Sequence, residues 1–159
     1  ACLSPRTHAA VLHQWCNQMG YRSCVFHSLD EKGGEVYHTN VMMCVADRYA
    51  VVCLESIRDA NEQQQLVQLL EQTGKTIIPI TLQQMNHFAG NMLQVKNGAA
   101  QPLLVMSSQA YRSLSAAQVA TLESFNPILH TDLTTIETNG GGSARCMLAE
   151  VFLPLKKRN

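Results

Sequence analysis

A repeat of about fifty residues constrains the fold of this chain more strongly than any other feature of its sequence. Residues 40–43 (NVMM) lie 51 positions before residues 91–94 (NMLQ), and residues 77–81 (IIPIT) lie 51 positions before residues 128–132 (ILHTD). Repeats of this length are typical of arrays in which each unit is one small supersecondary structure that packs against its neighbours. We therefore expect a pseudo-symmetric array of similar α/β units.

The first repeat covers residues 37–80 and is predicted to have the order strand, strand, helix, strand. The expected elements are strands over 41–46 and 49–54, a helix over about 59–72 and a strand over 76–80. The first two strands flank the turn at Asp47 and form a hairpin. Asp59 can cap the helix and Gly74 can end it.

The second repeat covers residues 91–130 and is predicted to have the same order. The expected elements are strands over 91–95 and 103–106, a helix from 115 to 124 and a strand over 127–130. Asn97 and Gly98 form a turn between the strands. Ser115 and Gln118 have the spacing of a capping box, which marks the start of the helix.

The residues before the first repeat predict one helix and one strand over 5–29. Ser4 can cap free backbone amides and Pro5 suits the first helical position, so the helix is expected over 5–19 with Gly20 as its stop. The run 23–29 is rich in residues that favour a strand.

A glycine-rich stretch, residues 138–149 (TNGGGSARCMLA), is predicted to be a nucleophile loop. Its three glycines allow the backbone to approach a ligand closely. Cys146 would then stand at the start of a strand over 147–152, within a final segment of 138–153. The alternative is a plain loop followed by a cysteine that only packs.

The repeat brings Cys146 close to a histidine. The 51-residue spacing that joins Asn40 to Asn91 leads on to Gly142, so the glycine loop would begin a third unit. Equivalent strand starts in such an array lie near its axis, and His38 also lies close to one. Because a nucleophile and its base must lie within hydrogen-bond reach, this placement favours a cysteine–histidine site.

Composition excludes several classes of function. The 12 basic and 12 acidic residues give a formal net charge of zero, which does not favour binding to nucleic acid or to a membrane surface. The six cysteines form no CxxC pair and no zinc-binding spacing, so we expect no metal and no cofactor. No apolar run approaches the roughly 20 residues of a membrane span, and we expect a cytoplasmic protein.

The motifs also resemble a known family. YHTNVMM at 37–43 and GGGSARCMLAE at 140–150 are similar to the guanidino-group-modifying enzymes of the pentein superfamily: arginine deiminases, dimethylarginine hydrolases and amidinotransferases. Together with ACLSPRT at 1–7 and VVCLESI at 51–57, they resemble most closely the bacterial citrulline-utilisation hydrolases. The resemblance implies an α/β propeller of five ββαβ-type units with its active site at the central axis. It also implies that Cys146 is the nucleophile and His38 the catalytic histidine.

Two features depart from the pattern of the family. Many members that act on a cationic guanidinium have an acid two residues after the histidine, where this chain has Asn40. A neutral amide suits the ureido group of citrulline better. The chain also offers only about three of the five units, so we interpret residues 1–159 as the C-terminal portion of one pentein domain. The expected partner is the N-terminal half of the same protein or another copy of the chain.

The expected function is therefore hydrolysis at the ureido or guanidino carbon of an arginine-related amino acid, with citrulline converted to ornithine. Alongside Asn40, we expect Gly141, Gly142 and Arg145 to bind the substrate, although an arginine at that position can also face solvent. The alternatives are an arginine deiminase, an amidinotransferase, or a non-catalytic pentein that binds a partner.

Overall fold

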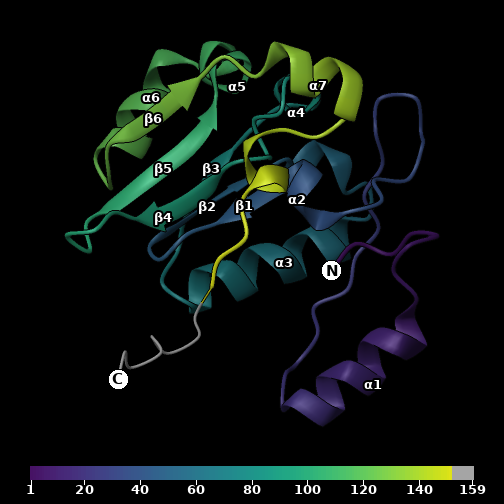
Figure 1. Cartoon of the computed structure of the whole chain (residues 1–159). Coiled ribbons are helices and arrows are strands. Elements are labelled where there is room, and N and C mark those ends of the chain that lie inside the picture. Colours follow the sequence, from purple (N-terminus) through teal and green to yellow (C-terminus); the bar gives the residue numbers. More distant parts are fainter. Residues whose placement is uncertain (152–159) are drawn as a thin grey trace, which may run out of the picture.

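The computed structural model describes residues 1–151 and contains two three-stranded sheets with helices around them (Figure 1). The α-helices are α1 (Ala9–Met19), α2 (Thr39–Met42), α3 (Ala60–Gln72), α4 (Leu82–Asn86), α5 (Ser108–Ser113), α6 (Ala116–Glu123) and α7 (Thr134–Gly140). The strands are β1 (Met43–Val45), β2 (Tyr49–Val52), β3 (Thr76–Pro79), β4 (Leu93–Lys96), β5 (Pro102–Ser107) and β6 (Ile128–Thr131). Two short 3-10 helices cover Leu54–Ser56 and Ala144–Met147.

The two sheets have the same plan. Strands β1 and β2 are antiparallel and β2 and β3 are parallel, and the second sheet repeats this arrangement with β4, β5 and β6. In each sheet the middle strand carries much of the core: all four residues of β2 are buried, as are Leu104 and Met106 of β5. The order strand, strand, helix, strand predicted for both repeats is confirmed, with strand ends that differ by a few residues.

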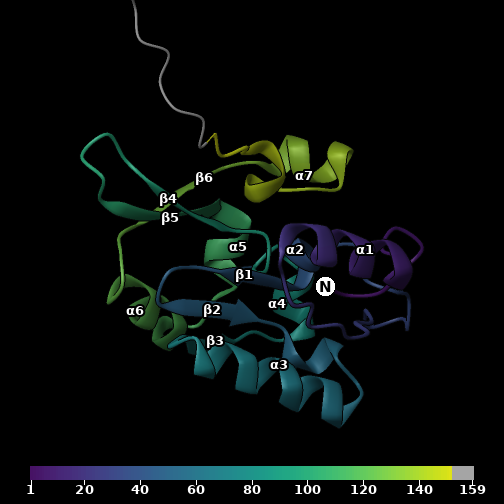
Figure 2. The same ribbon diagram turned by 90° about the horizontal axis from the view of Figure 1, so that it is seen from below.

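The two units lie side by side, with α3 beyond β3 on the outer side (Figure 2). Strand β1 contacts β4. A buried network also joins the units, because the Tyr49 hydroxyl donates to Asn126 Oδ1 at 3.1 Å and Gln94 Nε2 donates to the same oxygen at 2.8 Å. At Gly90 two backbone segments of the chain approach so closely that a Cβ atom would lie 2.3 Å from the carbonyl oxygen of Val41. Only glycine fits at this contact between the units.

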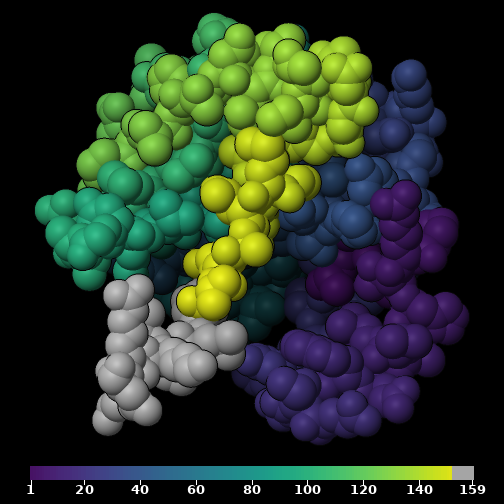
Figure 3. All heavy atoms as spheres, in the orientation of Figure 1, coloured from purple at the N-terminus to yellow at the C-terminus, as the bar shows by residue number. Residues whose placement is uncertain are grey.

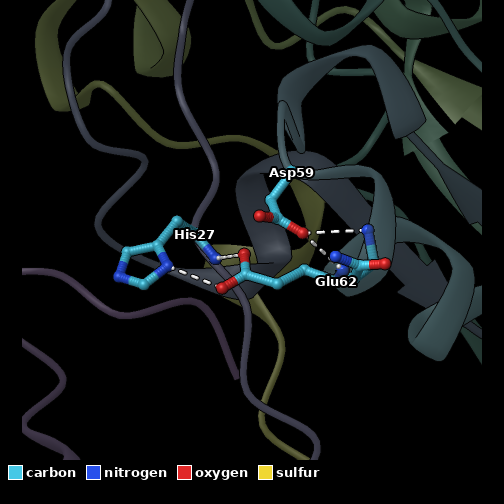
Figure 4. Close-up of polar contacts among 4 residues, drawn as sticks. His27, Asp59 and Glu62 are labelled. Carbon is cyan, nitrogen blue, oxygen red and sulfur yellow. Dashed lines mark hydrogen bonds and ion pairs between the residues drawn. The ribbon is translucent and has the colours of Figure 1, made fainter.

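The predicted helix caps are confirmed in both units. The Asp59 carboxylate accepts hydrogen bonds from the amides of Asn61, at 2.8 Å, and Glu62, at 3.0 Å, at the start of α3 (Figure 4). Ser115 and Gln118 form the expected capping box at the start of α6. These bonds use backbone donors that a helix leaves free at its first turn.

The segment 23–29 is not the predicted strand. It makes only isolated bridges, Phe26 with Cys2 and Leu29 with Glu35. It is held by α3 instead: the Glu62 carboxylate accepts from the His27 amide at 2.7 Å and lies 2.9 Å from His27 Nδ1 (Figure 4). A strand needs a neighbour with a matching edge, which its own sequence does not reveal.

The first helix begins later than predicted. It starts at Ala9 rather than Pro5, because the Ser4 hydroxyl donates to the carbonyl of Tyr37 at 3.1 Å and accepts from the Arg6 amide at 3.2 Å. Ser4 thus fixes a turn against a distant segment. The predicted stop at Gly20 is confirmed by its left-handed conformation, with φ of 71°.

Several short helices were not predicted. Residues 39–42 form α2, so the first strand of the unit begins at Met43 and not at Val41. Helices α4, α5 and α7 occupy segments for which no element was expected. Helix α4 carries a capping box, formed by Thr81 and Gln84, that the sequence analysis missed.

The glycine stretch also differs from its prediction. Gly140 ends α7, and Gly141 caps that helix in the left-handed conformation with φ of 68°. Cys146 lies in a 3-10 helix, and residues 148–151 are not a strand. Residue 152 of the predicted strand and residue 153 of the final segment lie outside the described residues. Residues 141–151, drawn in yellow, run across the surface between the first and second units (Figure 3).

No helix in residues 1–151 is both long enough and apolar enough to span a membrane.

Candidate active site

Cys146 and His38 line the same cavity, which has a volume of about 190 Å³. Its lining consists of Tyr37, His38, Asn40, Val41, Met85, Asn86, Phe88, Asn91, Gly141, Gly142 and Cys146. These residues come from the start of α2, the end of α4, the start of β4 and the glycine stretch. The convergence that the repeat predicted therefore brings both units and the final segment to one place.

The sulfur of Cys146 is surrounded by amide donors. Asn91 Nδ2 lies 3.2 Å from Sγ and Asn40 Nδ2 lies 3.7 Å from it. Cys146 is the exposed cysteine among the six, whereas Cys2, Cys16, Cys44 and Cys53 are buried. A small molecule can thus reach this sulfur from the cavity.

His38 stands at the start of α2, where its backbone is extended. Its ring is exposed and meets the Tyr37 ring edge-on, with the ring centroids 4.8 Å apart. Within residues 1–151, no hydrogen bond joins the His38 ring to Cys146. The two side chains face one cavity, in which a substrate could lie between them.

The glycine stretch is anchored by a buried carboxylate. Ser143 Oγ donates to Glu137 Oε1 at 2.6 Å, and both residues are buried. This bond ties the start of the 3-10 helix that carries Cys146 back to α7. Gly142 allows the tight approach, because a Cβ atom there would lie 3.1 Å from the Cys146 sulfur.

Arg145 is not among the residues that line this cavity, and its expected role in binding substrate stays a prediction. Its positive charge acts on the buried thiol of Cys44. Burial raises the pKa of Cys44 to about 11, and the charge of Arg145 partly offsets that rise.

A larger cavity, of about 560 Å³, lies between α4 and α5. Its lining includes His87 and Arg112 but no cysteine and no carboxylate. We take the smaller cavity as the candidate active site, because of these two cavities it is the one that combines a cysteine with a histidine. Among residues 1–151, no group of three or more histidine, cysteine, aspartate or glutamate side chains could hold a metal ion.

The sequence analysis assigned no functional role to Asn91 or to the α4 residues Met85 and Asn86. Asn91 could have been found from the repeat, since it is the equivalent of Asn40 in the second unit. The residues of α4 gave no comparable signal, because nothing in the repeat links them to the site.

Comparison with known proteins identifies the family. The family model described as N,N dimethylarginine dimethylhydrolase, eukaryotic, matches residues 1–153. The chain therefore belongs to this family of guanidino-group-modifying hydrolases. None of the curated proteins matches the chain.

Solved structures support the pentein fold. The apo structure of ArgZ, an arginine dihydrolase from the ornithine–ammonia cycle in Cyanobacteria, matches with a TM-score of 0.69 and 17% identity, over 92% of this chain and 21% of ArgZ. The product-bound N-terminal domain of ArgZ matches with a TM-score of 0.68 and 17% identity, over 92% of this chain and 48% of that domain. AgrE in complex with ornithine and NAD⁺ matches with a TM-score of 0.66 and 19% identity, over 99% of this chain and 21% of AgrE. This chain thus spans less than half the length of each of these structures.

Proposed function

We propose that this chain provides the nucleophile, Cys146, and the acid/base, His38, of a hydrolase that converts citrulline to ornithine. The observation that carries the proposal is the cavity that both side chains line. Family membership supports hydrolysis of a C–N bond at a guanidino-type carbon. The choice of citrulline rests on the groups that surround the sulfur.

These groups are neutral. Asn40 and Asn91 supply amides to the cavity, and no aspartate or glutamate is among the described residues that line it. A guanidinium cation is usually bound by a carboxylate, whereas a ureido group can be bound by amides alone. The lining therefore favours citrulline over arginine.

In the first step, the Cys146 thiolate attacks the ureido carbon while the proton from the thiol resides on His38. The bond from this carbon to the side-chain nitrogen breaks, and His38 protonates that nitrogen as ornithine leaves. The carbamoyl group remains on Cys146 as an S-linked thiocarbamate. The backbone amides of Gly142–Ala144 are candidates for binding the negative charge that develops on the oxygen, because none of the three donates a backbone hydrogen bond within the described residues.

In the second step, neutral His38 takes a proton from water, which attacks the carbamoyl carbon. The C–S bond breaks and Cys146 is restored. The released carbamate decomposes to ammonia and carbon dioxide. We also propose that the active assembly includes the other half of the pentein domain or a second copy of the chain, which would hold the amino-acid end of the substrate.

A second candidate is hydrolysis of N,N-dimethylarginine, which the description of the matching family favours. That reaction would attack a guanidino carbon and release dimethylamine, leaving citrulline as the product. The two candidates thus differ in whether citrulline is consumed or formed.

Product analysis of the full-length protein with citrulline, arginine and dimethylarginine separates the candidates. We expect ornithine from citrulline, and a loss of at least about 100-fold in rate for His38→Gln. His87→Gln is the matched control, since that exposed histidine lies outside this cavity. Two results would contradict citrulline as the substrate. One is the formation of citrulline from dimethylarginine, and the other is the release of ammonia from arginine when no ornithine forms from citrulline.

A further inference from the structure

We propose that Asn91 is a catalytic residue, whose side-chain amide holds the Cys146 sulfur in its thiolate form and fixes its position. This inference rests on the proposed function, because it concerns the same nucleophile. It adds to the cysteine–histidine pair a residue from the second unit that touches the reacting atom.

The orientation of the Asn91 amide is fixed by a neighbour that can only accept hydrogen bonds. Asn91 Nδ2 donates to the backbone carbonyl oxygen of Asn40 at 3.1 Å and lies 3.2 Å from Cys146 Sγ. The opposite orientation would place Asn91 Oδ1 against that carbonyl, with two acceptors facing each other. One N–H of the amide can thus bind the carbonyl while the other points at the sulfur.

The Cys146 sulfur accepts a hydrogen bond from the Asn91 N–H in this geometry. A thiolate accepts strongly, whereas a neutral thiol is a weak acceptor and also carries a proton of its own. When the thiol proton moves to His38, the amide of Asn91 gains a charged partner. Asn91 itself neither gives nor takes a proton, so it favours the thiolate by hydrogen bonding alone.

Asn91 is held in place at a cost in stability. It is 3% exposed, and its Oδ1 is buried without a hydrogen-bond partner among the described residues. An unpaired buried acceptor costs about 1–3 kcal/mol, and a site that keeps one needs an explanation. A role of Asn91 in positioning the Cys146 sulfur would explain why this buried, unpaired oxygen is kept.

The backbone before Asn91 is also unusual. Phe88 lies in the left-handed region with φ of 64°, which is rare for a bulky residue. Its backbone carbonyl accepts a hydrogen bond from the backbone amide of Asn91 at 2.8 Å. Gly90 allows the close contact with Val41. Residues 88–91 thus form a strained turn that delivers Asn91 to the sulfur.

The repeat explains why two asparagines approach one sulfur. Asn40 and Asn91 are equivalent positions in consecutive units, and both direct Nδ2 toward Cys146. Asn91 is the nearer and the more deeply buried of the two. We therefore assign Asn91 to the nucleophile and leave Asn40, which is half-buried, to the substrate.

The test compares Asn91→Ala, Asn91→Ser and the control Asn61→Ala, an exposed asparagine on α3, in the full-length protein. Two readouts are used at neutral pH: the rate of Cys146 alkylation by iodoacetamide, followed by peptide mass spectrometry, and the thiolate ultraviolet absorbance relative to Cys146→Ser. We expect Asn91→Ala to lower both, with a loss of about tenfold in the alkylation rate, and Asn91→Ser to retain part of each because its hydroxyl can donate. Asn61→Ala should match the unchanged protein.

A folded Asn91→Ala protein that keeps both the alkylation rate and the absorbance would overturn this inference alone. If Asn91→Ala does not fold, the same two readouts on Asn91→Ser test the inference. Unchanged thiolate absorbance with a slower turnover, in either variant, would show that Asn91 has a purely structural role and would overturn the inference. The proposed function fails separately if Cys146 of the unchanged protein has no thiolate absorbance and reacts no faster than free glutathione.

Discussion

At the scale of single residues, exposure separates Cys146 from the buried cysteines. Cys44 lies in β1, is 2% exposed, and has a pKa raised by burial to about 11. Cys146 is exposed and lies against two amide donors. Faster labelling of Cys146 alone would therefore reflect exposure as much as activation, which is why the Asn91 variants are needed to measure activation.

The buried acidic groups predict how stability depends on pH. Burial raises the pKa of Cys44 to about 11 from 9.0, and burial also raises the pKa of Tyr49 above 10.0, partly offset by its bond to Asn126. The folded state thus keeps protons that the unfolded state loses. The free energy of unfolding should be unaffected by these groups below about pH 9 and should fall above it, by up to about 1.4 kcal/mol per pH unit for each group.

Urea unfolding measured from pH 7 to 11 checks this expectation. Tyr49→Phe should weaken the fall, because it removes one of the two groups. Tyr21→Phe is the control, since Tyr21 is 60% exposed. Equal slopes for the two variants would contradict the assignment of the effect to Tyr49.

At the scale of elements, the glycine stretch shows where sequence reasoning succeeded and where it failed. The stretch was expected to bring Cys146 close to His38, and in the structure both residues line one cavity. Its local form was wrong, since Gly140 and Gly141 end a helix that was not expected. A glycine run is as compatible with the end of a helix as with a flexible loop. The hydrogen bond between Ser143 and Glu137, which the sequence does not reveal, is what distinguishes these two structures here.

The Glu137–Ser143 bond predicts a coupling between stability and activity. Ser143→Ala would leave the buried Glu137 carboxylate without its hydrogen-bond donor, which should cost about 1–3 kcal/mol of unfolding free energy. Loss of the anchor should also lower the rate of citrulline hydrolysis, because the loop no longer fixes Cys146. Glu123→Gln, on the exposed side of α6, should change neither. A Ser143→Ala protein whose unfolding free energy and rate of citrulline hydrolysis are both unchanged would contradict this coupling.

At the scale of the whole molecule, the repeat made two units and their meeting point predictable. Asn40 and Asn91 lie in equivalent places because the spacing is maintained from Asn40 to Ile128. The short helices lie outside the elements that the repeat predicts. Helix α4 was missed although Thr81 and Gln84 have the spacing of a capping box, and the bond from the Leu82 amide to Glu55 at 2.9 Å ties this helix to the first unit. The expected strand after Cys146 was absent over residues 148–151 because no neighbouring strand pairs with it there.

The central claim is that Cys146 forms a covalent bond to the carbon of its substrate. The most direct measurement is mass spectrometry of the Cys146 peptide, taken after the full-length protein is quenched in acid during turnover of citrulline. We predict the mass of one added carbamoyl group on Cys146, and no ornithine formation by Cys146→Ser. A carbamoyl group on another residue, or ornithine formed by Cys146→Ser at the unchanged rate, would contradict the account.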